Sequence, residues 1–157
     1  MKHYLEQATG VSLKNIARCA TKMSGFIVKT KNYSKQGQPR QCRINSQSLH
    51  LITPDSEVWF GYRIYPNNGD STDPHRTVQK KMGHICFEEH FVVRTKQGEF
   101  ICATPGENVV PDYEFWFVAV GPADPLSKDF NGNYEYTNDS GLDRVPYKMS
   151  LECQECS

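Results

Sequence analysis

Apolar side chains recur along two N-terminal segments with the spacing of amphipathic helices. In residues 11–23 the apolar positions are Val11, Leu13, Ile16, Ala17, Ala20 and Met23. The second segment, residues 40–52, follows Pro39, which fits the first turn of a helix, and ends before Pro54. The sequence therefore predicts two helices, separated by a short strand near residues 26–28 and a polar loop.

The pattern changes to that of β-strands after residue 56. Residues 57–65 are rich in β-branched and aromatic side chains, and a long polar loop follows at 66–82. Residues 84–103 predict a hairpin, because two apolar stretches flank a Lys-Gln-Gly turn. One face of its first strand carries His84, Cys86, Glu88, His90, Val92 and Arg94. A last strand is expected at 114–120. Helices followed by antiparallel strands predict an α+β fold, with the N-terminal helices packed on an antiparallel sheet.

Composition sets limits on the class of protein. The chain has 157 residues, with 18 Lys and Arg balanced by 18 Asp and Glu. We expect one α+β domain over residues 1–120 and a Gly-, Pro- and Asn-rich C-terminal extension over 121–157. Balanced charge makes nucleic acid an unfavoured partner. No apolar run reaches the ~18 residues of a membrane-spanning helix. The first residues lack the apolar region of a secretory signal, so we expect a cytoplasmic protein with reduced cysteines.

Candidate chemistry centres on Cys42 and His90. Cys42 falls in the first turn of the second predicted helix, where the helix dipole and unpaired N–H groups stabilise a thiolate. His90 lies in a strand among apolar residues and is a candidate base for that thiolate. The structural alternatives are a buried cysteine that only packs and a histidine that only hydrogen-bonds.

The order of short motifs resembles small bacterial and phage cysteine hydrolases with a papain-like or transglutaminase-like fold. Their helix motif, Cys-x-x-Asn followed by Ala or Ser, is matched by Cys42, Asn45 and Ser46. Later family motifs are matched by Gly61-Tyr62, His90-x-Val92-Val93, Gly98 and Thr104-Pro105. The resemblance spans about residues 41–105. It implies a papain-like core in which Cys42 is the nucleophile and His90 the base.

The third member of that triad departs from the family. Cys102 stands where the family has an aspartate, and a cysteine does not orient an imidazole as a carboxylate does. A Cys-His dyad with low or specialised hydrolase activity is one interpretation. A catalytically inactive binding or inhibitor module is a second. A zinc- or redox-responsive protein that uses Cys42 with Cys102, or Cys153 with Cys156, is a third.

The remaining expectations concern the oxyanion and the ligand. In papain-like enzymes a Gln-Gly six residues before the nucleophile donates to the oxyanion, which makes Gln36 a candidate by resemblance. Asn45 is a second candidate, and the backbone N–H of Cys42 is a third. We predict no cofactor and no resident metal. The expected substrate or partner is a peptide or protein with an amide, isopeptide or thioester bond.

Overall fold

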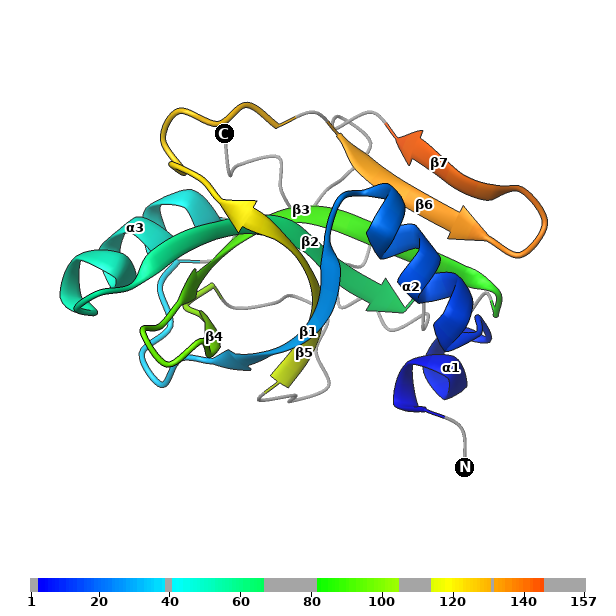
Figure 1. The fold of residues 1–157 in the computed structure, drawn as a ribbon, viewed down its shortest axis with the longest axis horizontal. Coiled ribbons are helices and arrows are strands. Elements are labelled where there is room, and N and C mark those ends of the chain that lie inside the picture. Colours follow the sequence, from blue (N-terminus) through cyan, green and yellow to red (C-terminus); the bar gives the residue numbers. More distant parts are fainter. Residues whose placement is uncertain (1–2, 39–40, 67–81, 105–113, 131, 146–157) are drawn as a thin grey trace.

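The computed structural model describes residues 3–38, 41–66, 82–104, 114–130 and 132–145. Its helices are α1 (Tyr4–Thr9), α2 (Leu13–Lys22) and α3 (Cys42–Ile52). Its strands are β1 (Phe26–Asn32), β2 (Glu57–Pro66), β3 (His84–Arg94), β4 (Phe100–Cys102), β5 (Glu114–Pro122), β6 (Asn133–Thr137) and β7 (Gly141–Val145). Figure 1 looks into a ring of strands, with α3 on one side and α1 and α2 on the other.

Five strands close into a barrel. They run in the order β2-β5-β1-β4-β3, and β3 pairs back with β2 to complete the ring. The β1–β4 pairing is parallel and the other pairings are antiparallel. β6 and β7 lie outside the ring as an extension of β3, along the upper edge in Figure 1. Closure removes the open sheet edges of the barrel strands, which are the usual sites of unwanted pairing.

The expected α+β architecture, with the N-terminal helices packed on an antiparallel sheet, is therefore wrong. The described chain is mostly strand, and the three helices lie outside a barrel that has its own core. The reason is β1, which the sequence predicted as a short strand at 26–28. It continues to Asn32 and joins β4 to β5. Alternating apolar positions show which residues share a face, but closure depends on pairing between distant segments.

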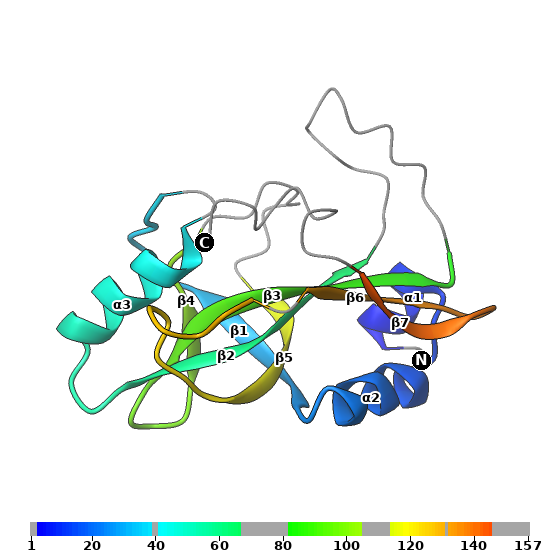
Figure 2. The ribbon, with the colours of Figure 1, turned by 90° about the horizontal axis from the view of Figure 1, so that it is seen from above.

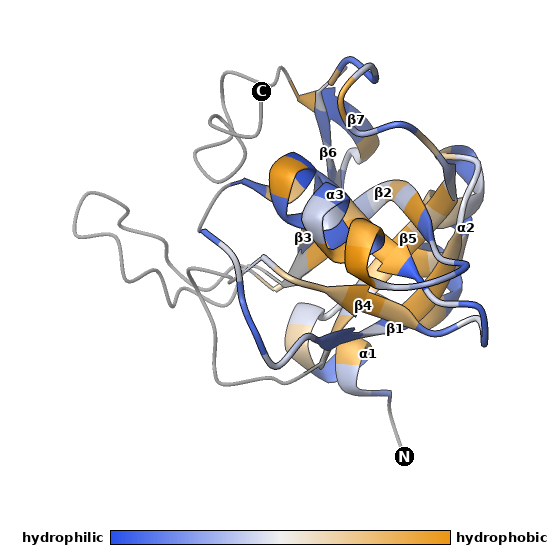
Figure 3. Ribbon diagram, turned by 90° about the vertical axis from the view of Figure 1, so that its left-hand side faces the viewer, coloured by the Kyte–Doolittle hydropathy of each residue, from blue (hydrophilic) through white to orange (hydrophobic). Residues whose placement is uncertain are grey.

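Two apolar clusters occupy the two faces of the barrel wall. The inner cluster takes residues from the barrel strands and none from the helices, so it fills the lumen: Trp59, Val92, Phe100, Cys102, Phe115, Phe117 and Ala119. The outer cluster joins the helices to the opposite strand faces, with Leu5, Ile16, Cys42, Leu49, Phe60, Phe91 and Val93 among its members. Figure 3 shows the hydrophobic colour gathered on the barrel strands. Both faces are apolar because both are buried.

Short-range signals explain the helices at the N-terminus. The His3 side chain accepts a hydrogen bond from Leu5 N (3.1 Å), and Gly10 ends α1 with a left-handed φ of 69°. Ser12 then caps α2 by accepting from Asn15 N (3.2 Å). The predicted helices at 11–23 and 40–52 are confirmed as α2 and α3, whereas α1 was not expected. In the described part of the chain, no helix has the length and apolar composition needed to cross a membrane.

Part of the C-terminal segment is more ordered than its composition indicated. β6 and β7 form a hairpin over residues 133–145, within the region expected to be loosely structured. The hairpin is fixed by β3 and by aromatic packing, since the Tyr134 ring meets the Tyr62 ring edge-on at 5.5 Å. Burial and the nearby Glu89 carboxylate raise the pKa of Tyr62, so its phenol stays neutral. These contacts are long-range, and Gly and Asn content does not reveal them.

A glycine permits close approach of β2 and β5. Gly61 is the Cα partner of His90 on one side and of Ala119 on the other, next to a bulge at Phe60. A Cβ at position 61 would collide with the Val118 carbonyl oxygen and the Phe117 ring. We expect Gly61→Ala to destabilise the fold by about 3 kcal/mol, at the upper end for overpacking, measured by urea unfolding.

The matched control is Gly121→Ala on β5, where an added Cβ meets no described atom within 4 Å. We expect it to change the free energy of unfolding by less than about 0.5 kcal/mol. Equal effects of the two substitutions would contradict the packing argument.

Candidate functional site

Along one edge, β3 pairs with two different strands. Residues 93–94 pair with 100–101 of β4, and residues 84–87 pair with β6. Among the described strands, none pairs with this edge over residues 88–92. We call this stretch the wall break. Buried backbone groups need partners, so side chains must supply hydrogen bonds there.

Two side chains do so from opposite directions. Ser46 Oγ on α3 donates to the Phe91 carbonyl oxygen (3.0 Å). Asn133 Oδ1 at the start of β6 accepts from Glu89 N (3.0 Å). The first half of α3 and the start of β6 are thereby fastened to the wall break on either side of His90.

The first turn of α3 is also tied to the end of β4. Asn45 Nδ2 donates to Thr104 Oγ1 (3.0 Å) and to the Gln38 carbonyl oxygen (2.7 Å). Asn45 Oδ1 accepts from Gln38 N (3.2 Å). Asn45, Ser46 and Thr104 are all buried. One helical turn therefore bridges β3 and β4 where these strands separate.

Cys42 occupies the same side of α3. It is the first helical residue and precedes Asn45 and Ser46 by three and four positions, the spacing that places side chains on one helix face. Its side chain is fully buried and belongs to the outer cluster with Phe91 and Ala103. The helix face that carries the thiol rests on β3 next to His90 and on the chain that follows Cys102.

His90 and Cys102 form a hydrogen-bonded pair. Their Nε2 and Sγ atoms lie 3.1 Å apart, and Thr104 N lies 3.4 Å from the same sulfur. Both residues are buried, with 4% and 0% of their surface exposed. The imidazole meets the Phe115 and Phe117 rings edge-on, at centroid distances of 5.9 and 6.3 Å. These contacts hold the imidazole in a fixed orientation inside an otherwise apolar site.

Charged residues share the lumen with this pair. Glu88 precedes His90 by two positions and so faces the same way, as the alternation predicted. Its Cα partner on β2 is Arg63, whose guanidinium lies 4.2 Å from the centre of the Phe115 ring. Both charged residues are at least 94% buried. Arg63 was not among the predicted site residues, although its spacing from Trp59 and Gly61 places it on the inner face.

The two side-chain amides considered for the oxyanion are used in the fold. Gln36 is exposed, and its Nε2 donates to the Tyr33 and Cys102 carbonyl oxygens (2.6 and 3.2 Å). Asn45 is bonded as described above. A role for either amide as an oxyanion donor stays a prediction, and it would require these bonds to be exchanged for bonds to substrate.

A segment that follows β5 covers the outside of α3. Arg43 Nη1 donates to the Pro125 carbonyl oxygen (2.9 Å), and its guanidinium stacks on Phe130 at 4.1 Å. Lys128 lies 4.2 Å from the centre of the Phe60 ring. Residues 123–130 therefore lie against the first turn of α3, and we call them the cover.

The other cysteines fall into three groups. Burial raises the pKa of the Cys19 thiol to about 11, so this thiol stays protonated. Cys86 lies with His84 and Glu135 in a cluster that the sequence analysis did not anticipate. Cys153 and Cys156 lie outside the described residues. The missed cluster depends on the pairing of β3 with β6, and local spacing shows only its His-x-Cys half.

The role of Asn45 as a bridge is testable. Removal of its three hydrogen bonds by Asn45→Ala should lower the free energy of unfolding by about 2–4 kcal/mol, at about 1 kcal/mol for each bond. Urea unfolding measures this change. Asn15→Ala on α2 is the control, because within the described residues no hydrogen bond of the Asn15 side chain is seen. Equal losses for the two variants would contradict the bridging role.

Comparison with known proteins assigns the chain to no family. No family model matches the chain, and neither a curated protein nor a solved structure matches it. The geometry of the wall break and of the His90–Cys102 pair is therefore the basis on which function is argued.

Proposed function

We propose that this protein is a cysteine-dependent hydrolase or acyltransferase acting on an amide, isopeptide or thioester bond. Cys42 is its nucleophile, and His90 is its general base and acid. The observation that carries the proposal is the buried His90–Cys102 pair, 3.1 Å apart, whose chain neighbours Phe91 and Thr104 are hydrogen-bonded to Ser46 and Asn45 of the helix that Cys42 begins.

The start of α3 supports an anionic sulfur. A helix N-terminus carries partial positive charge and N–H groups with no carbonyl partner inside the helix. The first turn of α3 holds no acidic residue, and the Gln41 side chain makes no capping hydrogen bond within the described residues. This end of the helix is suited to a thiolate at Cys42, or to an oxyanion held by the Cys42 N–H.

The proposed reaction follows from these positions. His90 takes the proton from the Cys42 thiol, and the sulfur attacks the carbonyl carbon of the substrate. The bond to the leaving amine or thiol breaks, and His90 returns the proton to that leaving group. Water or a second amine then attacks the thioester on Cys42, loses its proton through His90, and releases the acyl group as acid or amide.

Cys102 serves as the positioning residue for His90. Its sulfur contacts Nε2, so Nδ1 is the nitrogen that would exchange a proton with Cys42. Because a thiol does not stabilise an imidazolium as strongly as a carboxylate does, we expect slower proton transfer than in a triad with an aspartate.

A catalytically inactive binding module is the second candidate function. It is favoured by the complete burial of both Cys42 and Cys102. A substrate reaches Cys42 only if its surroundings, which include the cover at residues 123–130, move away. A binding module needs no such movement.

Cysteine-resolved alkylation separates the two functions. Full-length protein is treated with iodoacetamide over a range of pH, and each cysteine is followed by mass spectrometry. An activated Cys42 should reach half its maximal rate at a pH well below the ~8.5 of an ordinary thiol. At pH 6 it should react about 100-fold faster than Cys19, the buried internal reference. The shape of the pH profile identifies a thiolate even where burial slows every rate.

His90→Gln tests the partner, with His84→Gln on the same strand as the matched control. The first substitution should return the Cys42 profile to that of an ordinary thiol, and the second should leave it unchanged. A Cys42 that is inert, or whose profile ignores His90→Gln, would exclude the hydrolase and favour the binding module.

Replacement of the third residue gives an independent prediction. Cys102→Asp places a carboxylate beside the imidazole, which favours the charged imidazolium and the thiolate. We expect about tenfold faster alkylation of Cys42 at pH 6 than in the parent protein, since a nearby opposite charge shifts a pKa by about 1–3 units. Cys102→Ser keeps the size without the charge and should not accelerate the reaction. Acceleration by both variants would instead indicate a loosened site.

A further inference from the structure

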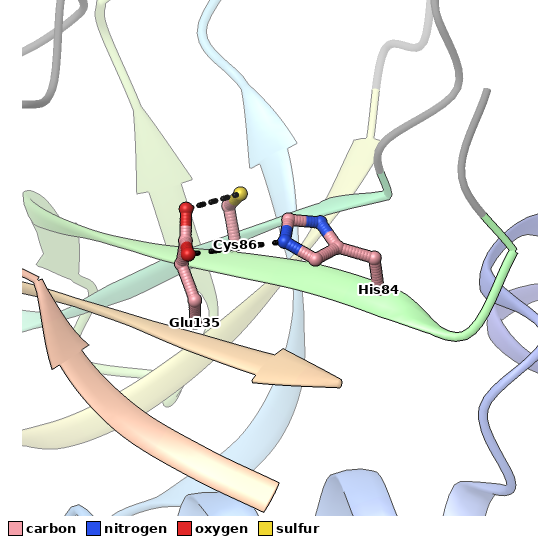
Figure 4. A group of neighbouring side chains, drawn as sticks. All are labelled: His84, Cys86 and Glu135. Atoms are coloured by element: carbon pink, nitrogen blue, oxygen red, sulfur yellow. Dashed lines mark hydrogen bonds and ion pairs between the residues drawn. The ribbon is translucent and has the colours of Figure 1, made fainter. Parts of the chain in front are cut away.

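A second cluster of reactive side chains lies on the outer half of β3. His84 and Cys86 are two residues apart and so share a face of the strand. Glu135 on β6 is the Cα partner of Cys86 in the antiparallel pair. Figure 4 shows the three side chains turned toward one another above the β3–β6 pair.

The ligand atoms of this cluster converge. Glu135 Oε2 lies 3.8 Å from His84 Nε2, and Glu135 Oε1 lies 3.9 Å from Cys86 Sγ. The nitrogen, sulfur and oxygen atoms all lie within 4.8 Å of one another. Each residue is partly buried, and 16% of the His84 side chain is exposed. The cluster is therefore held by the sheet and remains within reach of solvent.

These distances are close to those around a bound zinc ion. Tetrahedral bonds of about 2.0–2.3 Å place neighbouring ligand atoms about 3.3–3.8 Å apart. Imidazole nitrogen, thiolate sulfur and carboxylate oxygen are the three ligand types that zinc takes from proteins. Magnesium and calcium prefer oxygen ligands and would leave the sulfur unused.

We propose that His84, Cys86 and Glu135 bind one divalent transition-metal ion of the zinc type, with a fourth position taken by water. The site lies apart from the wall break and is independent of the function proposed above. The ion joins β3 to β6. Because β7 pairs with β6, the whole β6–β7 hairpin is held more firmly on the barrel.

Titration of the chelator-treated full-length protein with Co²⁺ tests the site directly. A thiolate ligand gives a charge-transfer band in the near ultraviolet, and Zn²⁺ should displace Co²⁺ and remove the band. We expect one equivalent to bind. Cys86→Ser should abolish the band. His84→Gln or Glu135→Gln should weaken binding about 100-fold, because loss of even a residue that only hydrogen-bonds to a metal ligand lowers metal affinity 10–100-fold.

Asp143→Asn is the matched control for Glu135→Gln. Asp143 on β7 is the Cα partner of Glu135, so the two substitutions remove the same charge from neighbouring positions. We expect the control to weaken binding less than about threefold, because an exposed neighbouring charge acts only through screened attraction. Equal losses would mean that negative charge alone attracts the ion, and the site would be rejected.

The test must also exclude binding of the ion by two other pairs of cysteines. Binding should persist in a Cys153→Ser/Cys156→Ser double variant and in a Cys42→Ser/Cys102→Ser double variant. A charge-transfer band that survives Cys86→Ser, or that disappears in either double variant, would overturn the proposal. So would the absence of any binding by the parent protein, which would reduce the cluster to an ion pair between His84 and Glu135.

Thermal unfolding shows whether a variant has lost the site or only its fold. The metal-free parent and metal-free Glu135→Gln should unfold at similar temperatures, because the ion pair that is lost is partly exposed. Saturating Zn²⁺ should raise the unfolding temperature of the parent protein and leave the unfolding temperature of Glu135→Gln unchanged. An equal rise in both proteins would contradict binding at this cluster.

Discussion

The separation of β3 from β4 beyond the Val93–Ile101 pair, toward residues 88–92 of β3, is the constraint on which the site depends. A barrel wall that loses a strand pairing must satisfy the exposed backbone groups in another way. Here the first turn of α3 does so from one side and the start of β6 does so from the other. The thiol of Cys42 lies on the same helix face as Asn45 and Ser46, whose side chains are required there for structural reasons.

The lumen of the barrel explains why a histidine is stable at this point. Phe115 and Phe117 exclude water from the imidazole, and the Cys102 sulfur satisfies Nε2. Arg63 and Glu88 add opposite charges on directly opposed residues of β2 and β3. Buried polar groups of this kind cost free energy unless each is paired. Their concentration on one side of an otherwise aromatic lumen is typical of a site with a chemical role.

The sequence supplied local features and missed those that depend on distant pairing. The helix that Cys42 begins and the alternation along β3 were predictable, because each depends only on residues that are close in sequence. Closure of the barrel was not, because it requires β1 to pair with both β4 and β5. The same reason applies to Glu135, whose place beside Cys86 depends on the β6–β7 hairpin. The Gly, Pro and Asn content of that region had predicted a loosely structured segment. Arg63 is an intermediate case, since its spacing from Gly61 gave its face, but its burial required the closed lumen.

The two cysteine-containing clusters are linked by the strand edge that they share. His84, Cys86, Glu88 and His90 occupy alternate positions of β3, so both clusters lie on one face of one strand. Asn133, two residues before Glu135 on β6, holds the backbone N–H of Glu89, the neighbour of His90. The short strand β6 therefore carries one residue of the proposed metal site and one residue that is bonded to the wall break. The two residues that flank His90 are thus held from opposite sides, Phe91 by α3 and Glu89 by β6.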